Sequence, residues 1–229
     1  MTSKNVLLFV TSHGNLGTTG HQTGFWYEEL AAPYYVFKDA GFHPVIVTPK
    51  GGRPPIDPGS EGADFRTASV ERFAADSEAQ SALGNSVPFK DAPADPAAVF
   101  LVGGHGTMWD FPEWSGLARA LEEADRGAKP VGAVCHGVAG LLSYRTNGRL
   151  PFVDQKKLTG FTNQEEAAVG LTAVVPFLLQ TRLEEGGASF SEGGVFSEHT
   201  ITDGLLVTGQ NPVSSRRAAE AVLDLLGAK

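Results

Sequence analysis

The sequence predicts an α/β fold built on a mostly parallel sheet that is covered on both faces. Residues 5–11 are a continuous apolar run without alternation, as expected of a strand buried on both sides, and residues 41–48 and 95–102 are predicted as a second strand and a third, buried strand. Helix-compatible segments separate these runs, which is the order of a β-α-β chain. The chain also has 28 glycines, which suit the many tight turns of this fold class.

Length, charge and cysteine content narrow the class of protein. At 229 residues, we expect one domain over residues 1–229, with an elaboration at about residues 50–92. A net charge of −8 argues against a nucleic-acid or anionic-membrane surface, so a small molecule or a protein is the expected partner. No apolar run approaches the ~20 residues that span a bilayer, and the N-terminus lacks a signal-peptide pattern. A single cysteine excludes an internal disulfide and suits a reducing compartment, so we expect a cytoplasmic protein.

The same patterns place the other elements. Residues 12–24, rich in Gly, Thr, Ser and His, are expected as a loop at the C-terminal end of the first strand, without a phosphate-loop motif. Residues 60–90 lean towards helix. The remaining predicted elements are helices at 25–40, 113–127, 176–183 and 216–226, and short strands at 131–134, 188–190 and 205–208.

One charged residue lies on the apolar face of the helix predicted at residues 25–40. A 3.6-residue period places Glu29 among apolar side chains and places Ala31 and Tyr35 on the opposite face. Pro33 removes the hydrogen bond to the Glu29 carbonyl, so a distortion is expected there. A carboxylate that points inward is costly unless it is protonated, paired or hydrogen-bonded. Two interpretations stay open: an inward functional carboxyl, or a side chain that reaches solvent at the helix edge.

Residues 129–142 have the order strand, sharp turn, helix. The β-prone run 131–134 leads to Cys135 and His136, and small residues stand two positions before and after the cysteine, at Ala133 and Gly137. A nucleophile elbow needs this arrangement. At a helix N-terminus, free N–H groups and the helix dipole favour a thiolate, so we expect the pKa of Cys135 to lie below about 8.5. The alternative is an inert buried cysteine, and the neighbouring residues favour the nucleophile.

Two further segments carry candidate site residues. Gly103 and Gly104 follow a buried strand and precede His105, so their N–H groups could form an oxyanion hole, a tight turn, or both. Thr162 and Glu165 have the spacing of a capping box, which would occupy Glu165 and leave Glu166 free to point elsewhere.

The histidines give no sign of a metal site. There is no HExxH pattern and no second cysteine for a Cys/His pattern, so we predict no metal and no other cofactor. The alternative is a zinc site assembled from distant loops. The six histidines are scattered along the chain, at His13, His21, His43, His105, His136 and His199.

Five segments together resemble the ThiJ/PfpI superfamily (class I glutamine amidotransferase-like), and within it the heat-inducible chaperone and glyoxalase III branch. They occur in the same order, from the first strand to the last helix. They are Gly24-x-x-x-x-Glu29-x-x-x-Pro33, Gly103-Gly-His-Gly, Ala-Val-Cys135-His136-Gly, Lys157-Leu-Thr-Gly-Phe-Thr with Glu166, and Asp203-Gly-Leu-Leu-Val-Thr-Gly-Gln-Asn-Pro212.

The resemblance implies a flavodoxin-like, doubly wound sheet with helices on both faces, usually in a dimer. It also implies a Cys-His-acid site without a cofactor. Cys135 would be the nucleophile, His136 the base, and Glu166 the acid that orients His136. Glu29 would be the buried carboxyl that hydrogen-bonds the cysteine sulfur.

The leading functional hypothesis is a glyoxalase III-type enzyme that converts a 2-oxoaldehyde such as methylglyoxal to a 2-hydroxy acid. The thiolate of Cys135 would add to the aldehyde. Three residues would bind the oxyanion and the substrate, namely Gly103, Gly104 and His105. One alternative is a stress-protective holdase with little catalysis, which predicts an exposed apolar patch. Another is an amidase or amidotransferase-like hydrolase, which the adjacency of Cys135 and His136 disfavours because glutamine amidotransferases usually separate the two.

Overall fold

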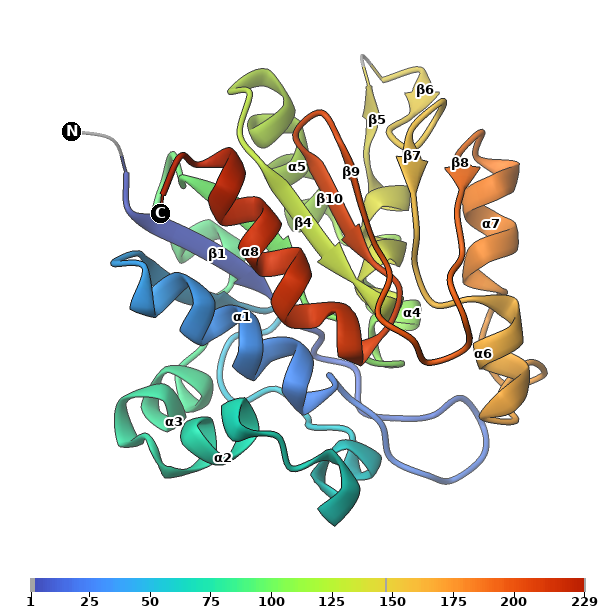
Figure 1. Cartoon of the computed structure of the whole chain (residues 1–229), viewed down its shortest axis with the longest axis horizontal. Coiled ribbons are helices and arrows are strands. Elements are labelled where there is room, and N and C mark those ends of the chain that lie inside the picture. The colour runs from blue at the N-terminus through green and yellow to red at the C-terminus, as the bar shows by residue number, and fades with distance from the viewer. Residues whose placement is uncertain (1–2, 147, 229) are drawn as a thin grey trace.

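A six-stranded sheet forms the centre of the protein. The computed structural model describes residues 3–146 and 148–228 and confirms the predicted α/β architecture, with the strand order β2-β1-β3-β4-β10-β9 (Figure 1). Five strands are parallel and only β9 runs antiparallel, against β10. The sheet consists of β1 (Asn5–Phe9), β2 (His43–Val47), β3 (Ala98–Leu101), β4 (Val131–Val134), β9 (Thr200–Asp203) and β10 (Leu206–Gly209).

The central strands form because their side chains are apolar on both faces. Every residue of β3, β4 and β10 is buried, as are Val6–Phe9 of β1. The edge strand β9 was not predicted from the sequence. It reads Thr-Ile-Thr-Asp and is mostly half-buried, so it lacks the continuous apolar run by which the central strands are recognised.

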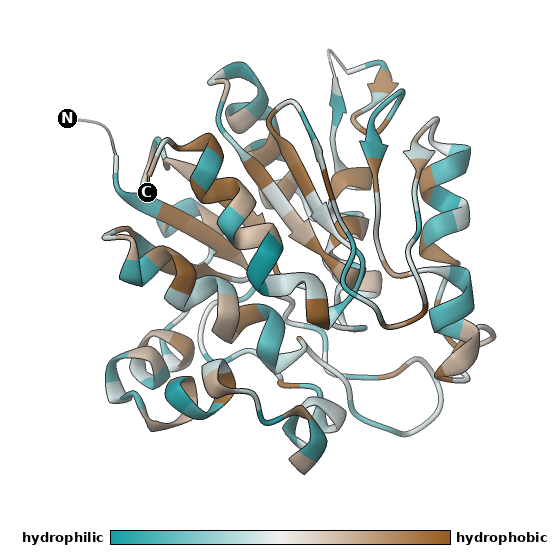
Figure 2. Ribbon diagram, in the orientation of Figure 1, coloured by the Kyte–Doolittle hydropathy of each residue, from teal (hydrophilic) through white to brown (hydrophobic). Residues whose placement is uncertain are grey.

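Helices cover both faces of the sheet. The helices α1 and α8 cross the near face in Figure 1, and α5 lies behind the sheet. Figure 2 shows hydrophobic residues along the central strands and hydrophilic ones on the outer sides of the helices. The α-helices are α1 (Tyr27–Asp39), α2 (Ala68–Ala75), α3 (Ser77–Gly84), α4 (Thr107–Asp110), α5 (Ser115–Arg126), α6 (Asn163–Ala168), α7 (Leu179–Glu185) and α8 (Ser215–Leu225). Among the described residues, no helix is long and apolar enough to cross a membrane.

The short elements lie outside the central sheet. Two small two-stranded sheets pair β5 with β6 and β7 with β8. Their strands are β5 (Arg145–Thr146), β6 (Leu150–Pro151), β7 (Lys157–Leu158) and β8 (Ser189–Phe190). The 3₁₀ helices are η1 (Pro58–Glu61), η2 (Ala63–Phe65), η3 (Phe89–Asp91), η4 (Cys135–Ser143) and η5 (Pro212–Ser214).

The predicted outer face of α1 is wrong in part. Ala31 and Tyr35 are buried, and α2, which belongs to the segment of residues 50–92, packs against α1 on the side of Tyr35. Phe73 of α2 lies 6.1 Å from Tyr35 between ring centroids, and the Tyr35 hydroxyl donates to Asp76 at 2.9 Å. A helix covered on both sides loses the one-faced pattern on which the prediction depended. Pro33 lies within the helix, which continues through it to Asp39.

Candidate active site

The candidate site lies at the C-terminal ends of β3 and β4, which are adjacent parallel strands. The loop after β3 supplies His105, and the turn after β4 supplies Cys135 and His136. Glu29 comes from the first turn of α1 and Glu166 from α6. The start of α1 is tied to the β3 loop because the Trp26 N–H donates to the Gly103 carbonyl at 3.1 Å. Four segments therefore meet at the edge of the sheet where α/β proteins carry their sites.

Cys135 occupies the strained turn that a nucleophile elbow requires. Its φ of +54° lies in the left-handed region, which non-glycine residues rarely adopt. A Cβ atom at Gly137 would lie 2.6 Å from the carbonyl oxygen of Leu101, so only glycine allows this close approach of the turn to β3. The segment that follows is a 3₁₀ helix, η4, where an α-helix was expected.

A chain of contacts joins the cysteine to an acid. Cys135 Sγ lies 3.4 Å from His136 Nδ1, and His136 Nε2 lies 2.8 Å from Glu166 Oε2. All three residues are buried, with Cys135 3% exposed and His136 fully covered. Phe161 packs against His136, at 4.3 Å between ring centroids. Phe161 belongs to one of the five family segments, but its contact with the imidazole could not be predicted because it depends on tertiary packing.

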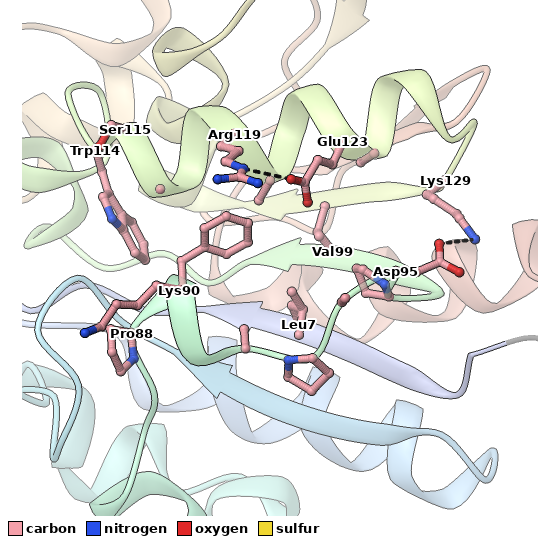
Figure 3. A pocket seen from close by; sticks show the side chains of 18 of the residues that line it. Leu7, Pro88, Lys90, Asp95, Val99, Trp114, Ser115, Arg119, Glu123 and Lys129 are labelled. Carbon is pink, nitrogen blue, oxygen red and sulfur yellow. Dashed lines mark hydrogen bonds and ion pairs between the residues drawn. The ribbon is translucent and has the colours of Figure 1, made fainter.

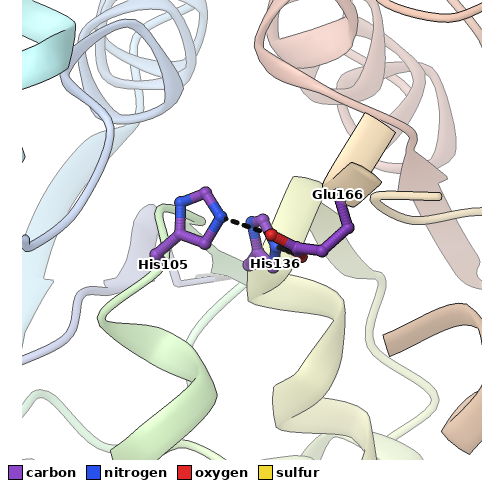
Figure 4. Close-up of side chains that lie close together, drawn as sticks. All are labelled: His105, His136 and Glu166. Carbon is purple, nitrogen blue, oxygen red and sulfur yellow. Dashed lines mark hydrogen bonds and ion pairs between the residues drawn. The ribbon is translucent and has the colours of Figure 1, made fainter. Parts of the chain in front are cut away.

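His105 is the second histidine bound to the same carboxylate. Its Nε2 lies 2.9 Å from Glu166 Oε1, so each oxygen of Glu166 holds one imidazole (Figure 4). The His105 and His136 ring centroids are 4.0 Å apart. The sequence placed His105 beside the oxyanion, and its pairing with Glu166 was not foreseen because 61 positions separate the two residues.

The buried network fixes two protonation states. Burial and the charge of a protonated His105 together lower the pKa of His136 to about 4, against the pull of Glu166. Burial opposes ionisation of Glu166, yet the interactions with His136 and His105 outweigh it and lower the pKa of Glu166 to about 2. Because His136 is neutral above about pH 4, donated hydrogen bonds rather than a His136 ion pair hold the carboxylate at neutral pH.

Glu29 points inward, which resolves the choice left open by the sequence. The residue is fully buried, and burial raises the pKa of Glu29 well above its ordinary value. The Cys135 thiol and the Gly103 N–H are close enough to offset part of this rise. However, neither carboxyl oxygen has a partner of full hydrogen-bond geometry among the described residues, so burial dominates. The carboxyl group therefore stays protonated and neutral to a higher pH than an exposed glutamate does.

The expected low pKa of Cys135 is wrong for the unliganded site. Burial raises the pKa of the Cys135 thiol well above its ordinary value, and the charge that Glu29 carries when ionised raises it further. The N–H of His136 offsets only part of this. The sequence argument counted the free N–H groups of a helix terminus and had no measure of desolvation, which is a property of the tertiary structure.

The loop after β3, which contains Gly103 and Gly104, has the features of an anion-binding turn. Gly104 has a φ of +108°, a conformation that suits glycine. Within the described part of the chain, the N–H groups of Gly104 and His105 make no hydrogen bond to another residue. Free N–H donors after β3, the strand that pairs with the one leading to Cys135, suit an oxyanion hole.

Glu165 has the capping role that the sequence predicted, and a second role that it did not. The Thr162 hydroxyl accepts from the Glu165 N–H at 3.0 Å, and Glu165 Oε2 accepts from the Thr162 N–H at 3.0 Å, which confirms the capping box. The other oxygen, Oε1, accepts from Phe196 N–H, Gln210 Nε2 and Asn211 Nδ2 at 2.8–3.0 Å. Glu165 therefore fastens the loop around Phe196 to the start of α6.

The geometry of one cluster would also suit a metal ion. The ligand atoms of His105, His136 and Glu166 lie within 4.8 Å of one another. Sequence spacing could not reveal this set, because its members come from three separate segments. The hydrogen bonds within the set account for its arrangement, and the absence of a metal remains a prediction.

A separate cavity lies away from the candidate site. It measures about 740 Å³ and lies between α5 and the segment before β3, with Phe89, Trp114 and Arg119 among its lining residues (Figure 3). None of the candidate site residues lines it.

A comparison with family models decides the family. The model of the DJ-1/PfpI family matches residues 22–225, which include all four segments of the site. This chain belongs to the DJ-1/PfpI family. Among solved structures, that of the Rapid Encystment Protein 24 kDa of Francisella tularensis is similar to this chain, with a TM-score of 0.93 and 36% identity, and with 99% of each chain covered. These matches confirm the flavodoxin-like α/β fold.

Several relatives that cover almost the whole chain are named as glyoxalases. The glutathione-independent glyoxalase HSP31 of Saccharomyces cerevisiae is 31% identical, with 99% of both chains covered. Glyoxalase 3 of Candida albicans is 32% identical, with 95% of this chain and 96% of that protein covered. The crystal structure of glyoxalase III from Candida albicans has a TM-score of 0.89 and 30% identity, with 96% of each chain covered.

Proposed function

We propose that this protein is a glutathione-independent glyoxalase that converts a 2-oxoaldehyde such as methylglyoxal, with water, to a 2-hydroxy acid. The observation that carries the proposal is the continuous chain from Cys135 Sγ through His136 to Glu166, with the inward Glu29 beside it. The full-length similarity to proteins named glutathione-independent glyoxalases supports the same activity.

The first step is addition of Cys135 to the aldehyde. The Sγ–C1 bond forms while the thiol proton moves to His136 Nδ1, 3.4 Å away, and the carbonyl electron pair moves to O1. His136 then gives this proton to O1, which yields a hemithioacetal. Because the proton moves as the bond forms, the raised pKa of the free Cys135 thiol does not prevent the reaction.

The remaining steps exchange oxidation states within the substrate. The hydrogen on C1 leaves as a proton, and its electron pair forms a C1=C2 bond while O2 takes the carbonyl pair. C2 then gains a proton, and the proton on O1 passes to O2, which leaves a thioester at Cys135. Water cleaves the thioester and releases the 2-hydroxy acid and the free thiol. C1 is oxidised and C2 is reduced by the same two electrons, so no external oxidant is needed.

Glu29 has a supporting role in this proposal. Glu29 is protonated and fully buried, so its carboxyl group, rather than water, donates a hydrogen bond to the sulfur when negative charge develops there. Glu166 keeps its charge and holds the two imidazoles in one tautomer. The free N–H groups of Gly104 and His105 stabilise the developing oxyanion.

We also propose that the protein acts as a cytoplasmic homodimer. The resemblance to the family supports the dimer, and the single free Cys135 suits a reducing compartment. Light scattering after gel filtration should give twice the chain mass of 24.1 kDa, and a mass of one chain would contradict the dimer.

Lactate formation tests the activity. The purified protein is incubated with methylglyoxal in glutathione-free buffer, and lactate is measured by NMR. We expect lactate in proportion to enzyme, unchanged when glutathione is added. Loss of methylglyoxal without lactate would contradict the proposal, as would release of ammonia from glutamine as the only turnover, which would indicate an amidase.

A further inference from the structure

We propose that His105 is the second catalytic residue of this site, the base that takes the proton from C1 and returns it to C2. This inference rests on the proposed function. It assigns the proton transfer between adjacent carbons, which the chain from Cys135 to Glu166 leaves without a carrier.

The shared carboxylate fixes the tautomer of both imidazoles. An ionised carboxylate only accepts hydrogen bonds, so the Nε2 atoms of His105 and His136 must both donate to Glu166. A neutral imidazole carries one N–H, so the Nδ1 atom of each ring is then unprotonated. Glu166 therefore prepares two bases at once (Figure 4).

The two bases differ in what they face. His136 Nδ1 lies 3.4 Å from Cys135 Sγ and is engaged with the thiol proton. His105 Nδ1 makes no hydrogen bond with any residue that the structure describes. The His105 side chain is also 11% exposed, whereas that of His136 is fully buried. Of the two, His105 is the base that is both unoccupied and open to a substrate.

The C1 proton needs a separate carrier because the Nδ1 atom of His136 faces the sulfur and the His136 ring is fully buried. His136 moves the thiol proton to O1, while the C1 proton must be held and then delivered to C2. When His105 removes the C1 proton it becomes an imidazolium 2.9 Å from Glu166 Oε1, which stabilises it. The positive charge on His105 lowers the pKa of His136, so the two rings are not protonated at the same time.

Product stereochemistry tests the proposal. The variant His105→Gln is compared with wild type for kcat, KM and the enantiomer ratio of the lactate, with His21→Gln, an exposed loop histidine, as the matched control. We expect His105→Gln to lower kcat at least about 100-fold with little change in KM, and the residual lactate to be racemic because solvent then protonates C2 from both faces. His21→Gln should match wild type.

Two measurements separate catalysis from folding. The rate of Cys135 alkylation by iodoacetamide should be unchanged in His105→Gln, because His136 and Glu166 stay in place. The variant His105→Ala should regain part of its kcat when imidazole is added to the buffer.

A wild-type kcat and a single lactate enantiomer from His105→Gln would overturn the role of His105 but not the proposed function. Failure of imidazole to rescue a folded His105→Ala would also overturn it. Absence of lactate from the wild-type protein would overturn the proposed function and this inference together.

Discussion

Glu29 and Gly103 are in such close contact that residue 103 cannot carry a side chain. A Cβ atom there would overlap Glu29 Oε2 and would lie 2.5 Å from the carbonyl oxygen of Val134. The glycine after β3 thus sets the depth at which the Glu29 carboxyl is buried beside Cys135.

We therefore expect Gly103→Ala to lower both stability and activity. Because the methyl group must displace Glu29 or the backbone of β4, the free energy of unfolding should fall by about 2–4 kcal/mol. Urea unfolding measures the change. Gly84→Ala is the control, since the nearest atom to a Cβ there is 4.0 Å away. Equal stability of the two variants would contradict the packing described at Gly103.

The buried Glu29 carboxyl predicts a pH-dependent stability. Its pKa is raised in the folded state, so its contribution is fully present below about pH 4.5, the ordinary value, and is lost as the pH rises towards the folded pKa. Glu29→Gln cannot ionise and avoids this loss. The stability of Glu29→Gln relative to wild type should therefore increase with pH, by up to about 1.4 kcal/mol per pH unit.

Urea unfolding from about pH 4.5 to about pH 8 measures this trend. Glu113→Gln, which changes an exposed glutamate, is the control and should show no trend. A constant difference between Glu29→Gln and wild type across the range would mean that Glu29 is not buried as a neutral acid.

Removal of the charge of Glu166 should disable the site without unfolding the protein. The amide in Glu166→Gln presents one acceptor and one donor where two acceptors stand, so one of His105 and His136 must change tautomer. We expect kcat to fall about 100-fold or more. Steady-state kinetics against Glu113→Gln measures it, and a change of less than about threefold would show that neither imidazole depends on Glu166.

Glu165 should matter for stability more than an exposed glutamate does. Its two oxygens accept from Thr162, Phe196, Gln210 and Asn211, so Glu165→Ala leaves several buried donors without a partner. We expect the free energy of unfolding to fall by at least about 3 kcal/mol. Glu184→Ala, an exposed glutamate that accepts one hydrogen bond, should cost less than about 1 kcal/mol. Similar losses for both variants would refute the anchoring role.

Local patterns predicted most of the fold and part of the site. The buried strands, the turn at Cys135 and the division of labour between Glu165 and Glu166 each follow from residues within a few positions of one another. An inward Glu29 could be raised as one of two interpretations, because its neighbours on the helix face are apolar.

Tertiary properties account for what the sequence did not predict. His105 and Glu166 are brought together by the sheet, and the burial of Tyr35 depends on the elaboration that covers α1. The direction of the Cys135 pKa shift was wrong for the same reason, since desolvation is set by everything packed around the sulfur. The edge strand β9 lacks an apolar run and so carries no signal of its own.

The most direct test of the proposed enzyme is a single substitution at the sulfur. Lactate formation from methylglyoxal is measured without glutathione for wild type and for Cys135→Ser, which keeps the size and fold of the site but has a far weaker nucleophile. We expect the serine variant to retain less than about one thousandth of the wild-type kcat. Full turnover by a folded Cys135→Ser protein would contradict the central role of the thiol.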